Sequence, residues 1–528
     1  MSERFDVVVV GGGVNGLVAA ATLGRGGARV LLLERGESIG GQSATTEFAP
    51  GFRVAPLAAD PGWLPPAIAV DLGLPNVERA EEGAGISVVE EPGRCLTIPH
   101  HGSRAIEAIR ARSASDAAKW PAFTARLRKL AGFLESLYQV PVPDIDARAL
   151  DDLLPMVGVG RKFRALGRVD MIELLRTLPM SVWELLDDWF ETPALKAAVA
   201  ATGIQDLQQG PRSGGTGFVL LHHLVGAPQG SVRGRAPWRA GPGAFASAVE
   251  KMTRGTSGVT IRYGARLVRV NVVDEAVRGV VLESGETIEA RGVISTAAPA
   301  QTFLDWIDPV WLDPEFVHAV RNIRYRGCTA LVLYALDVAP RIRGLTAEEF
   351  AGVVSLTPRV EAIERAADAA KYGEVSASPH IELTMPTALW PDLAPASKHI
   401  LVARVQYAPY RLREGVWDTA RGEALAKTVT KAIDAVAPGF SSRVLHRVVW
   451  SPLDLEQRYG LHQGAASHGE LALDQILFMR PVAGWGKHRT PIEGLYLGGA
   501  GAHPGPGVLG GPGWLAAKRW LKDRKART

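Results

Sequence analysis

The stretch FDVVVVGGGVNGLVAAATLGRGGARVLLLE, residues 5–34, decides the fold of this chain. FDVVVV is a short run rich in β-branched residues, which is typical of a parallel strand buried on both faces. Three glycines follow at once, and LVAAATLGRGG predicts a helix that leads to a second buried strand, RVLLLE. The order of strand, tight turn, helix and strand is the start of a Rossmann-type α/β fold.

The glycines at the turn each have a physical reason to be glycine. Gly11 lets the chain turn tightly, Gly13 lets backbone N–H groups approach a pyrophosphate, and Gly16 lets the helix pack on the strand. Glu34 follows about 20 residues later, where its carboxylate can accept a hydrogen bond from a ribose 2′-hydroxyl. This frame predicts a dinucleotide site without separating NAD from FAD. Asn15, inside the motif, is expected to serve the loop rather than the chemistry.

The same G-x-G-x-x-G spelling occurs again in GGAGAHPGPGVLGGPGW, residues 498–514. GLYLGGA supplies a strand there, but Pro504, Pro506 and Pro512 remove N–H donors from a loop that should offer them. No strand with a terminal acid follows in the remaining WLAAKRWLKDRKART. The second match is therefore not expected to form a nucleotide fold of its own.

The residues after Glu34 resemble those of the FAD-dependent amine oxidase and phytoene desaturase relatives. In those families, Glu-Arg and Gly-Gly elements continue the FAD site, and ERGESIGGQ, residues 34–42, supplies both. The resemblance implies that Arg35, Gly41 and Gln42 contact FAD. Carotenoid desaturases usually have Gly-Gly-Arg at this place, so Gln42 argues against a carotenoid substrate but not against the flavin.

The end of the chain resembles the same relatives. GLYLGGAGAHPGPGVLGGPG, residues 494–513, matches their C-terminal strand and the loop that passes along the flavin. The resemblance implies that this strand returns beside the first strand and that Gly501 lies near the phosphate and ribityl chain. It also implies that Val508 and Leu509 lie near the isoalloxazine. One nucleotide site, built from both ends of the chain, is therefore expected.

The middle of the chain is divided between two expected domains. Residues 258–299 alternate with period two and predict a β-meander. In the family this segment carries an apolar residue whose backbone meets the adenine, and Leu267 occupies that place. We expect a discontinuous Rossmann-type FAD-binding domain, residues 1–75, 240–305 and 485–528, and an interleaved, helix-rich substrate-binding domain, residues 76–239 and 306–484. Motifs at 210–226, 241–245 and 469–485 extend the resemblance over nearly the whole chain, closest to its phytoene-dehydrogenase-like branch.

Composition and cysteine usage exclude several other classes. The chain has 528 residues, of which 47% are hydrophobic and 22% charged, as in an ordinary globular protein. The net charge of +4 comes from nearly balanced acids and bases, so no nucleic-acid partner is expected. Cys95 and Cys328 form no C-x-x-C, and no H-E-x-x-H or Cys/His cluster predicts a metal site. The N-terminus has no basic region before its apolar run, so a cytoplasmic location is expected.

The chemistry expected here needs no protein nucleophile, because flavin N5 accepts a hydride from a C–H bond held against the ring. His503, in the loop near the flavin, is the candidate catalytic residue, although a turn histidine bonded to backbone would fit its position equally well. The basic tail favours a packed terminal helix over a membrane anchor. A peripheral membrane contact stays open if the substrate is lipidic.

The sequence thus predicts an FAD-dependent oxidoreductase, a dehydrogenase or desaturase, acting on a small lipophilic substrate that is apolar or amphipathic. No separate NAD(P)H motif is visible, so reoxidation by oxygen, a quinone or another acceptor is favoured. One alternative is a flavin-dependent isomerase or saturase that works without net oxidation. Another is a flavin-bound structural or regulatory protein with little turnover. The sequence leaves the substrate, the electron acceptor and the oligomeric state open.

Overall fold

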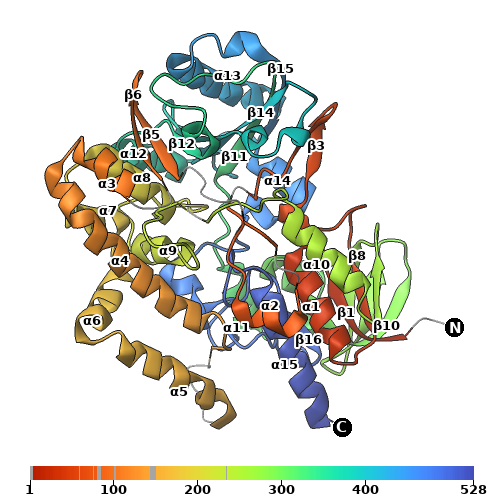
Figure 1. The fold of residues 1–528 in the computed structure, drawn as a ribbon. Helices are drawn as coiled ribbons and strands as arrows, with labels where there is room; N and C mark the ends of the chain where they lie inside the picture. Colours follow the sequence, from red (N-terminus) through yellow and green to blue (C-terminus); the bar gives the residue numbers. More distant parts are fainter. Residues whose placement is uncertain are drawn as a thin grey trace.

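The computed structural model of the protein describes residues 4–58, 60–74, 77–79, 85–99, 103–142, 150–233 and 235–527. Two seven-stranded sheets, each covered by helices, form the framework (Figure 1). The α/β fold class predicted from the sequence is confirmed. The structure adds a large second sheet to the part of the chain that was expected to be rich in helices.

The first sheet begins with the two strands of the opening stretch. Its members are β1 (Arg4–Val10), β2 (Val30–Leu33), β7 (Val259–Arg262), β8 (Leu267–Val273), β9 (Ala276–Leu282), β10 (Thr287–Ser295) and β16 (Leu495–Leu497). Strands β7, β2, β1 and β10 lie in this order and are parallel, whereas β8, β9 and β10 form the predicted antiparallel meander. All these strands lie inside the three segments expected for the FAD-binding domain, whose boundaries stay a prediction.

The C-terminal strand does not lie where the resemblance placed it. β16 pairs in parallel with β10, not with β1. The expectation that it returns beside the first strand is therefore wrong by one position. The reason is that both edges of β1 are already occupied, one by β2 and the other by β10.

The second sheet belongs to the segments expected to bind the substrate. It consists of β15 (Val444–Trp450), β11 (Thr329–Leu336), β14 (His399–Gln406), β13 (His380–Thr384), β12 (Val353–Ser355), β5 (Ile86–Glu91) and β6 (Arg94–Ile98), in this spatial order. A separate hairpin joins β3 (Thr46–Ala49) to β4 (Phe52–Val54).

The central strands of the second sheet have two different faces. On β13, Ile381 and Leu383 pack in the same apolar cluster as helix α13 (Thr419–Val436). His380 and Glu382 alternate with them, are equally buried and therefore lie on the opposite face. A buried face that carries charged side chains is unusual, and it borders the site described below.

Helices enclose both sheets. They are α1 (Val14–Arg25), α2 (Pro66–Leu72), α3 (Ser103–Arg110), α4 (Ala114–Leu137), α5 (Leu150–Ala165), α6 (Arg168–Thr177), α7 (Val182–Asp187), α8 (Pro193–Gly203), α9 (Thr216–His223), α10 (Ala244–Arg254), α11 (Pro314–Arg321), α12 (Val360–Lys371), α13, α14 (Pro452–Tyr459) and α15 (Gly511–Arg527). Helices α1, α10 and α15 lie together against the first sheet (Figure 1). Within the described part of the chain, no helix is both long and apolar enough to cross a membrane.

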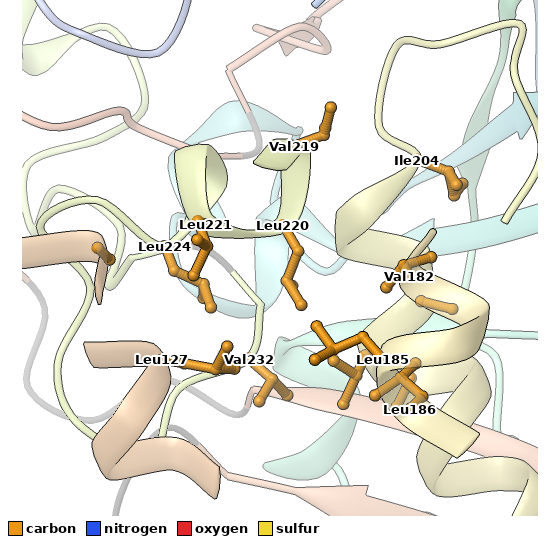
Figure 2. Packing of buried hydrophobic residues seen from close by; sticks show 14 of the residues in the cluster. Leu127, Val182, Leu185, Leu186, Ile204, Val219, Leu220, Leu221, Leu224 and Val232 are labelled. Atoms are coloured by element: carbon orange, nitrogen blue, oxygen red, sulfur yellow. The ribbon is translucent and has the colours of Figure 1, made fainter. Parts of the chain in front are cut away.

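The largest apolar cluster holds the helical part of the substrate segments together. Leu185 and Leu186 of α7, Leu220 and Leu221 of α9, and Leu127 of α4 point toward one another in it (Figure 2). Each of these side chains is almost fully buried, and burying a leucine is worth about 1.5–3 kcal/mol. This rigid packing fixes α9, whose C-terminal residues reach the site.

Candidate functional site

The start of α1 is a cradle for an anionic group. The residue before the helix, Gly13, provides no side-chain cap, and the first turn of α1 contains no acidic residue. The first backbone N–H groups of a helix have no partner within it, and together with the helix dipole they favour a phosphate. The residues present therefore fit the diphosphate of a dinucleotide.

Close approach explains two of the glycines in this turn. Gly11 has a φ of 101°, and a Cβ there would lie 2.3 Å from Oγ1 of Thr296. A Cβ on Gly16 would lie 1.9 Å from the carbonyl oxygen of Gly11, so only glycine lets α1 start so close to β1. Gly16 thus has the packing role that the motif predicts.

Glu34 is held firmly at the end of β2. Its Oε2 accepts a hydrogen bond from the Gly12 N–H at 2.7 Å, and its Oε1 accepts one from the Gly36 N–H at 2.8 Å. The carboxylate therefore joins the glycine turn to the loop after β2. Each oxygen keeps a further lone pair with which it can accept a ribose hydroxyl.

A cavity of about 880 Å³ opens at the carboxyl ends of β1 and β2. Most of the predicted cofactor-binding residues line it: Gly11, Gly13, Asn15, Glu34, Arg35, Gly41, Gln42, Leu267, Val508 and Leu509. Ligands of doubly wound α/β proteins bind at this edge of the sheet. That each residue contacts FAD stays a prediction, but the structure gathers them around one cavity.

The two ends of the chain meet at this cavity. The Trp63 N–H donates to the carbonyl oxygen of Gly507 at 2.8 Å, and the Leu509 N–H donates to the carbonyl oxygen of Trp63 at 2.7 Å. Gly510 packs on Val18 of α1, where a Cβ would lie 2.5 Å from a valine methyl group. Residues 505–510 thus form a wall that faces the cradle. Helix α15 begins only after the second glycine motif, whereas α1 begins within the first.

Three predicted site residues do not line the cavity. Gly16 packs behind it, as described above. A Cβ on Gly501 would lie 2.4 Å from Cδ of Pro299, so this glycine serves the packing of two loops, and Ala500 lines the cavity instead.

His503, the candidate catalytic residue, is also absent from the wall of the cavity. The ring is buried, and its Nε2 lies 3.2 Å from the carbonyl oxygen of Leu137. Since a carbonyl oxygen only accepts, Nε2 donates. Burial lowers the pKa of His503 to about 3. The geometry corresponds to the backbone-bonded histidine that the sequence also allowed.

Sequence reasoning missed several residues that line the cavity. They include Asp60, Ala466 and His468. The predicted Gln42 donates from its Nε2 to the carbonyl oxygen of Ala466 at 2.9 Å. The signal for Asp60 was the turn sequence Asp-Pro-Gly, in which an aspartate typically binds the backbone two residues on. The structure has this bond, from the Gly62 N–H to Oδ1 of Asp60 at 3.0 Å.

A buried arginine ties together the loops near the cavity. Arg480 donates to the carbonyl oxygen of Ala500 at 2.8 and 2.9 Å and to that of Gln475 at 2.9 Å. It also donates to the backbone carbonyl oxygen of Ser467 at 2.5 Å. Burial lowers its pKa to about 10, so it stays a cation at neutral pH. The guanidinium fixes the loop that carries His468 against the loop that carries Ala500.

A second cavity of about 240 Å³ lies between the first cavity and the polar face of the second sheet. Some residues line both cavities: Gln42, Leu57, Ala58, Asp60, Gly62, Ala466, Pro506 and Gly507. A molecule in the second cavity would therefore lie beside one in the first.

Ion pairs stand around the second cavity. Asp60 binds Arg235 through both carboxylate oxygens, at 2.8 and 3.0 Å, where the two cavities meet. Burial acts to raise the pKa of Asp60, but Arg235 and the Gly62 N–H together hold it below its usual value. Arg233 pairs with Glu382, and Arg404 pairs with Asp206.

His222 connects α9 to the C-terminal loop. Its Nε2 lies 2.9 Å from the carbonyl oxygen of Pro506, to which it must donate, and its Nδ1 lies 2.7 Å from the hydroxyl of Tyr138. Nδ1 is then unprotonated and accepts from the tyrosine. Burial holds the pKa of His222 well below its ordinary value, so this arrangement persists across the neutral range.

Both a family model and a protein of known sequence match this chain over most of its length or more than half of it. A family model described as flavin containing amine oxidoreductase matches residues 15–337, more than half of the chain. The rat protein named pyridine nucleotide-disulfide oxidoreductase domain-containing protein 2 is 32% identical, over 99% of this chain and 94% of its own length. In this chain both cysteines are free, so the disulfide of that name has no counterpart here.

More distant proteins are also similar over most of the chain. One of the subunits of limonene dehydrogenase from Castellaniella defragrans is 24% identical, over 96% of this chain and 92% of its own length. Among solved structures, cyclohexylamine oxidase from Brevibacterium oxydans matches with a TM-score of 0.54 at 14% identity, covering 99% of this chain and all of the other. At that identity the likeness is one of fold.

Proposed function

The chain belongs to the flavin containing amine oxidoreductases, and its cofactor is FAD. From this premise we propose that the protein is a dehydrogenase whose amphipathic substrate lies in the second cavity. It is an oxidoreductase of the FAD type. When bound, FAD supplies the two-electron acceptor, N5, which takes a hydride from a C–H bond.

One observation carries the proposal: the two cavities share a wall. Asp60, Gln42 and Pro506 border both of them, so a substrate in the second cavity would be held next to the cofactor cavity. Hydride transfer needs the reacting C–H bond held close to the acceptor and away from water. The second cavity, which is lined by residues of the central strands β13 and β14, would meet the first need.

The residues of the chain would act by holding and orienting. Glu34 and the N-terminus of α1 would hold the adenosine and diphosphate end of FAD. His222 and Arg480 would position the C-terminal loops, the former through Pro506 and the latter through Ala500. No side chain is needed as a nucleophile.

Anaerobic mixing tests the proposal. Small molecules that co-purify with the protein are identified by mass spectrometry and returned without oxygen, while flavin absorbance and products are followed. Dithionite, which reduces the flavin without a substrate, serves as the positive control. A dehydrogenase loses its flavin absorbance in proportion to product formed. Product without bleaching would favour an isomerase. The absence of both product and bleaching would favour a structural or regulatory role.

A simpler result would contradict all three functions. If the purified protein were colourless and regained no flavin absorbance when given FAD, the cofactor site itself would be in error. The cytoplasmic location, the absence of a nucleic-acid partner and a peripheral membrane contact with a lipidic substrate stay predictions. Cell fractionation and vesicle flotation would check the location and the membrane contact.

A further inference from the structure

The second cavity has a charged floor within a largely apolar molecule. Glu382 of β13 and Arg404 of β14 lie directly opposite each other in register, and both line the cavity. The side chain of Glu382 is only 6% exposed. Charged groups in central strands cost free energy, because apolar residues of similar volume usually pack there at least as well. A polar ligand in the cavity would offset that cost.

The charges of the described residues around this cavity balance. Among its described lining residues, the charged side chains are three arginines and three acids: Arg233, Arg235, Arg404, Asp60, Asp206 and Glu382. They form three ion pairs, as described above. His223, which also lines the cavity, is neutral because burial lowers its pKa to about 3.

Four side chains of the wall carry polar atoms that are not satisfied within the described structure. They are Nε2 of His223, Oε1 of Glu382, Nε of Arg404 and Oγ of Ser467. The carboxylate oxygen can only accept and the arginine N–H can only donate, so the set includes both kinds. A group that both donates and accepts matches both kinds of polar side chain in this wall, whereas a pure hydrocarbon matches neither.

Much of the rest of the wall is apolar. It includes Val54, Leu57, Met385, Leu389, Trp390 and Leu471. These side chains suit the hydrocarbon part of a ligand, so the cavity as a whole favours an amphipathic molecule.

We propose, on the basis of the function proposed above, that the second cavity binds a neutral amphipathic substrate and that a hydroxyl group of this substrate lies among the three ion pairs. A hydroxyl donates and accepts without adding charge. An ammonium or carboxylate group would bring one uncompensated charge into a cluster that is already neutral, which is costly away from water.

Four probes with the same cyclohexyl body test this preference. Cyclohexanol, cyclohexylamine, cyclohexanecarboxylate and cyclohexane are titrated into the FAD-loaded protein near neutral pH. Binding is measured by the change in flavin absorbance and by the shift of thermal unfolding. Cyclohexanol is expected to bind at least about tenfold more tightly than any of the other three.

Two substitutions should move the preference in opposite directions. Asp206→Asn leaves the cluster with an excess positive charge and should improve binding of the carboxylate relative to the alcohol by about tenfold or more. Arg404→Met leaves an excess negative charge and should do the same for the amine. Glu382→Gln repeats the positive excess at another place, in case Asp206→Asn does not fold.

The matched control lies on the same sheet but away from the cavity. Arg447 of β15 pairs with Glu423, whose side chain is 48% exposed, and Arg447→Met should leave the order of the four probes unchanged. Tighter binding of either charged probe to the unmodified protein, no binding of any probe, or equal shifts in the oppositely charged variants would overturn the proposal. Loss of FAD from the unmodified protein would instead count against the proposed function, so the two failures can be told apart.

Discussion

At the scale of single residues, Glu34 joins the glycine turn to the loop after β2. We predict that Glu34→Gln lowers the affinity for FAD by roughly tenfold to a hundredfold. Whichever way the amide turns, its NH₂ group faces one of the two N–H donors that the carboxylate now binds, Gly12 or Gly36. Equilibrium titration of the apoprotein with FAD measures the effect.

The neighbouring acid provides the control for this substitution. Glu37 lies exposed in the same loop, and Glu37→Gln changes the charge equally without touching the turn. It should leave FAD binding unchanged. Equal losses in both variants would show that net charge, not the position of Glu34, governs affinity.

His222 provides a second residue-scale prediction. His222→Phe leaves the Tyr138 hydroxyl and the Pro506 carbonyl oxygen without their partner, and the free energy of unfolding should fall by about 2–4 kcal/mol. Because Pro506 lines both cavities, the variant should also release FAD faster. Tyr138→Phe, which removes only one of the two bonds, should cost about half as much. Denaturant titration and FAD release rates test both, and unchanged values would contradict the positioning role.

Individual residues of the cofactor site were predictable where the backbone itself makes the site. Gly11, Gly13 and Glu34 have fixed places in a strand, turn and helix, so a single sequence suffices to place them. The Asp-Pro-Gly turn predicts the backbone bond of Asp60 but not its pair with Arg235, which joins distant segments and has no local signal. His223 likewise reaches its cavity only through the packing of distant segments. His503 lies in a loop in which other residues line the cavity, but the sequence does not specify the orientation of its ring.

At the scale of elements, α15 packs against α1 without space for a side chain. A Cβ on Gly513 would lie 1.9 Å from the carbonyl oxygen of Asn15. We predict that Gly513→Ala costs about 1–3 kcal/mol of stability and weakens FAD binding, because the start of α1 must shift. Thermal unfolding with and without FAD measures both effects.

An exposed glycine in another helix is the matched control. A Cβ on Gly160 of α5 would meet nothing within 4 Å, so Gly160→Ala should stabilise the protein by up to about 1 kcal/mol. If Gly513→Ala behaved in the same way, the close contact between α1 and α15 would not be needed.

The elements themselves differed in how well the sequence predicted them. The meander over β8, β9 and β10 was predictable, because its exposed edge alternates in polarity. The turn expected at Asp274-Glu275 is present, with positive φ at both residues. Strand β11, TALVLYAL, is buried along its whole length and so has no alternation. Such a run does not distinguish a strand from a buried helix, so it does not predict the second sheet.

At the scale of the whole molecule, several neutral histidines are buried. Burial is the main cause that lowers the pKa of five of them to about 3 or about 4: His223, His380, His468, His488 and His503. In the unfolded chain they take up protons below about pH 6.5, whereas in the folded protein they do not. The contribution of these histidines to the free energy of unfolding is therefore full above about pH 6.5, and it is lost as the pH falls toward about 4.

We predict a steep loss of stability in mild acid. At about pH 5 each of these histidines costs on the order of 1–2 kcal/mol, and the sum approaches the total stability of a typical protein. Thermal unfolding between neutral pH and about pH 5 should show the decline. His488→Asn keeps the left-handed backbone and a donor for the Leu497 carbonyl oxygen, and it should make the decline shallower. A melting temperature independent of pH over this range would refute the prediction.

The meeting of residues 11–16 with residues 505–510 has a consequence for synthesis. On the ribosome, the glycine turn emerges long before the loop that faces it. The nascent polypeptide therefore carries half a binding site while the segments between them are translated, and tight capture of the cofactor has to wait until residues 505–510 are released.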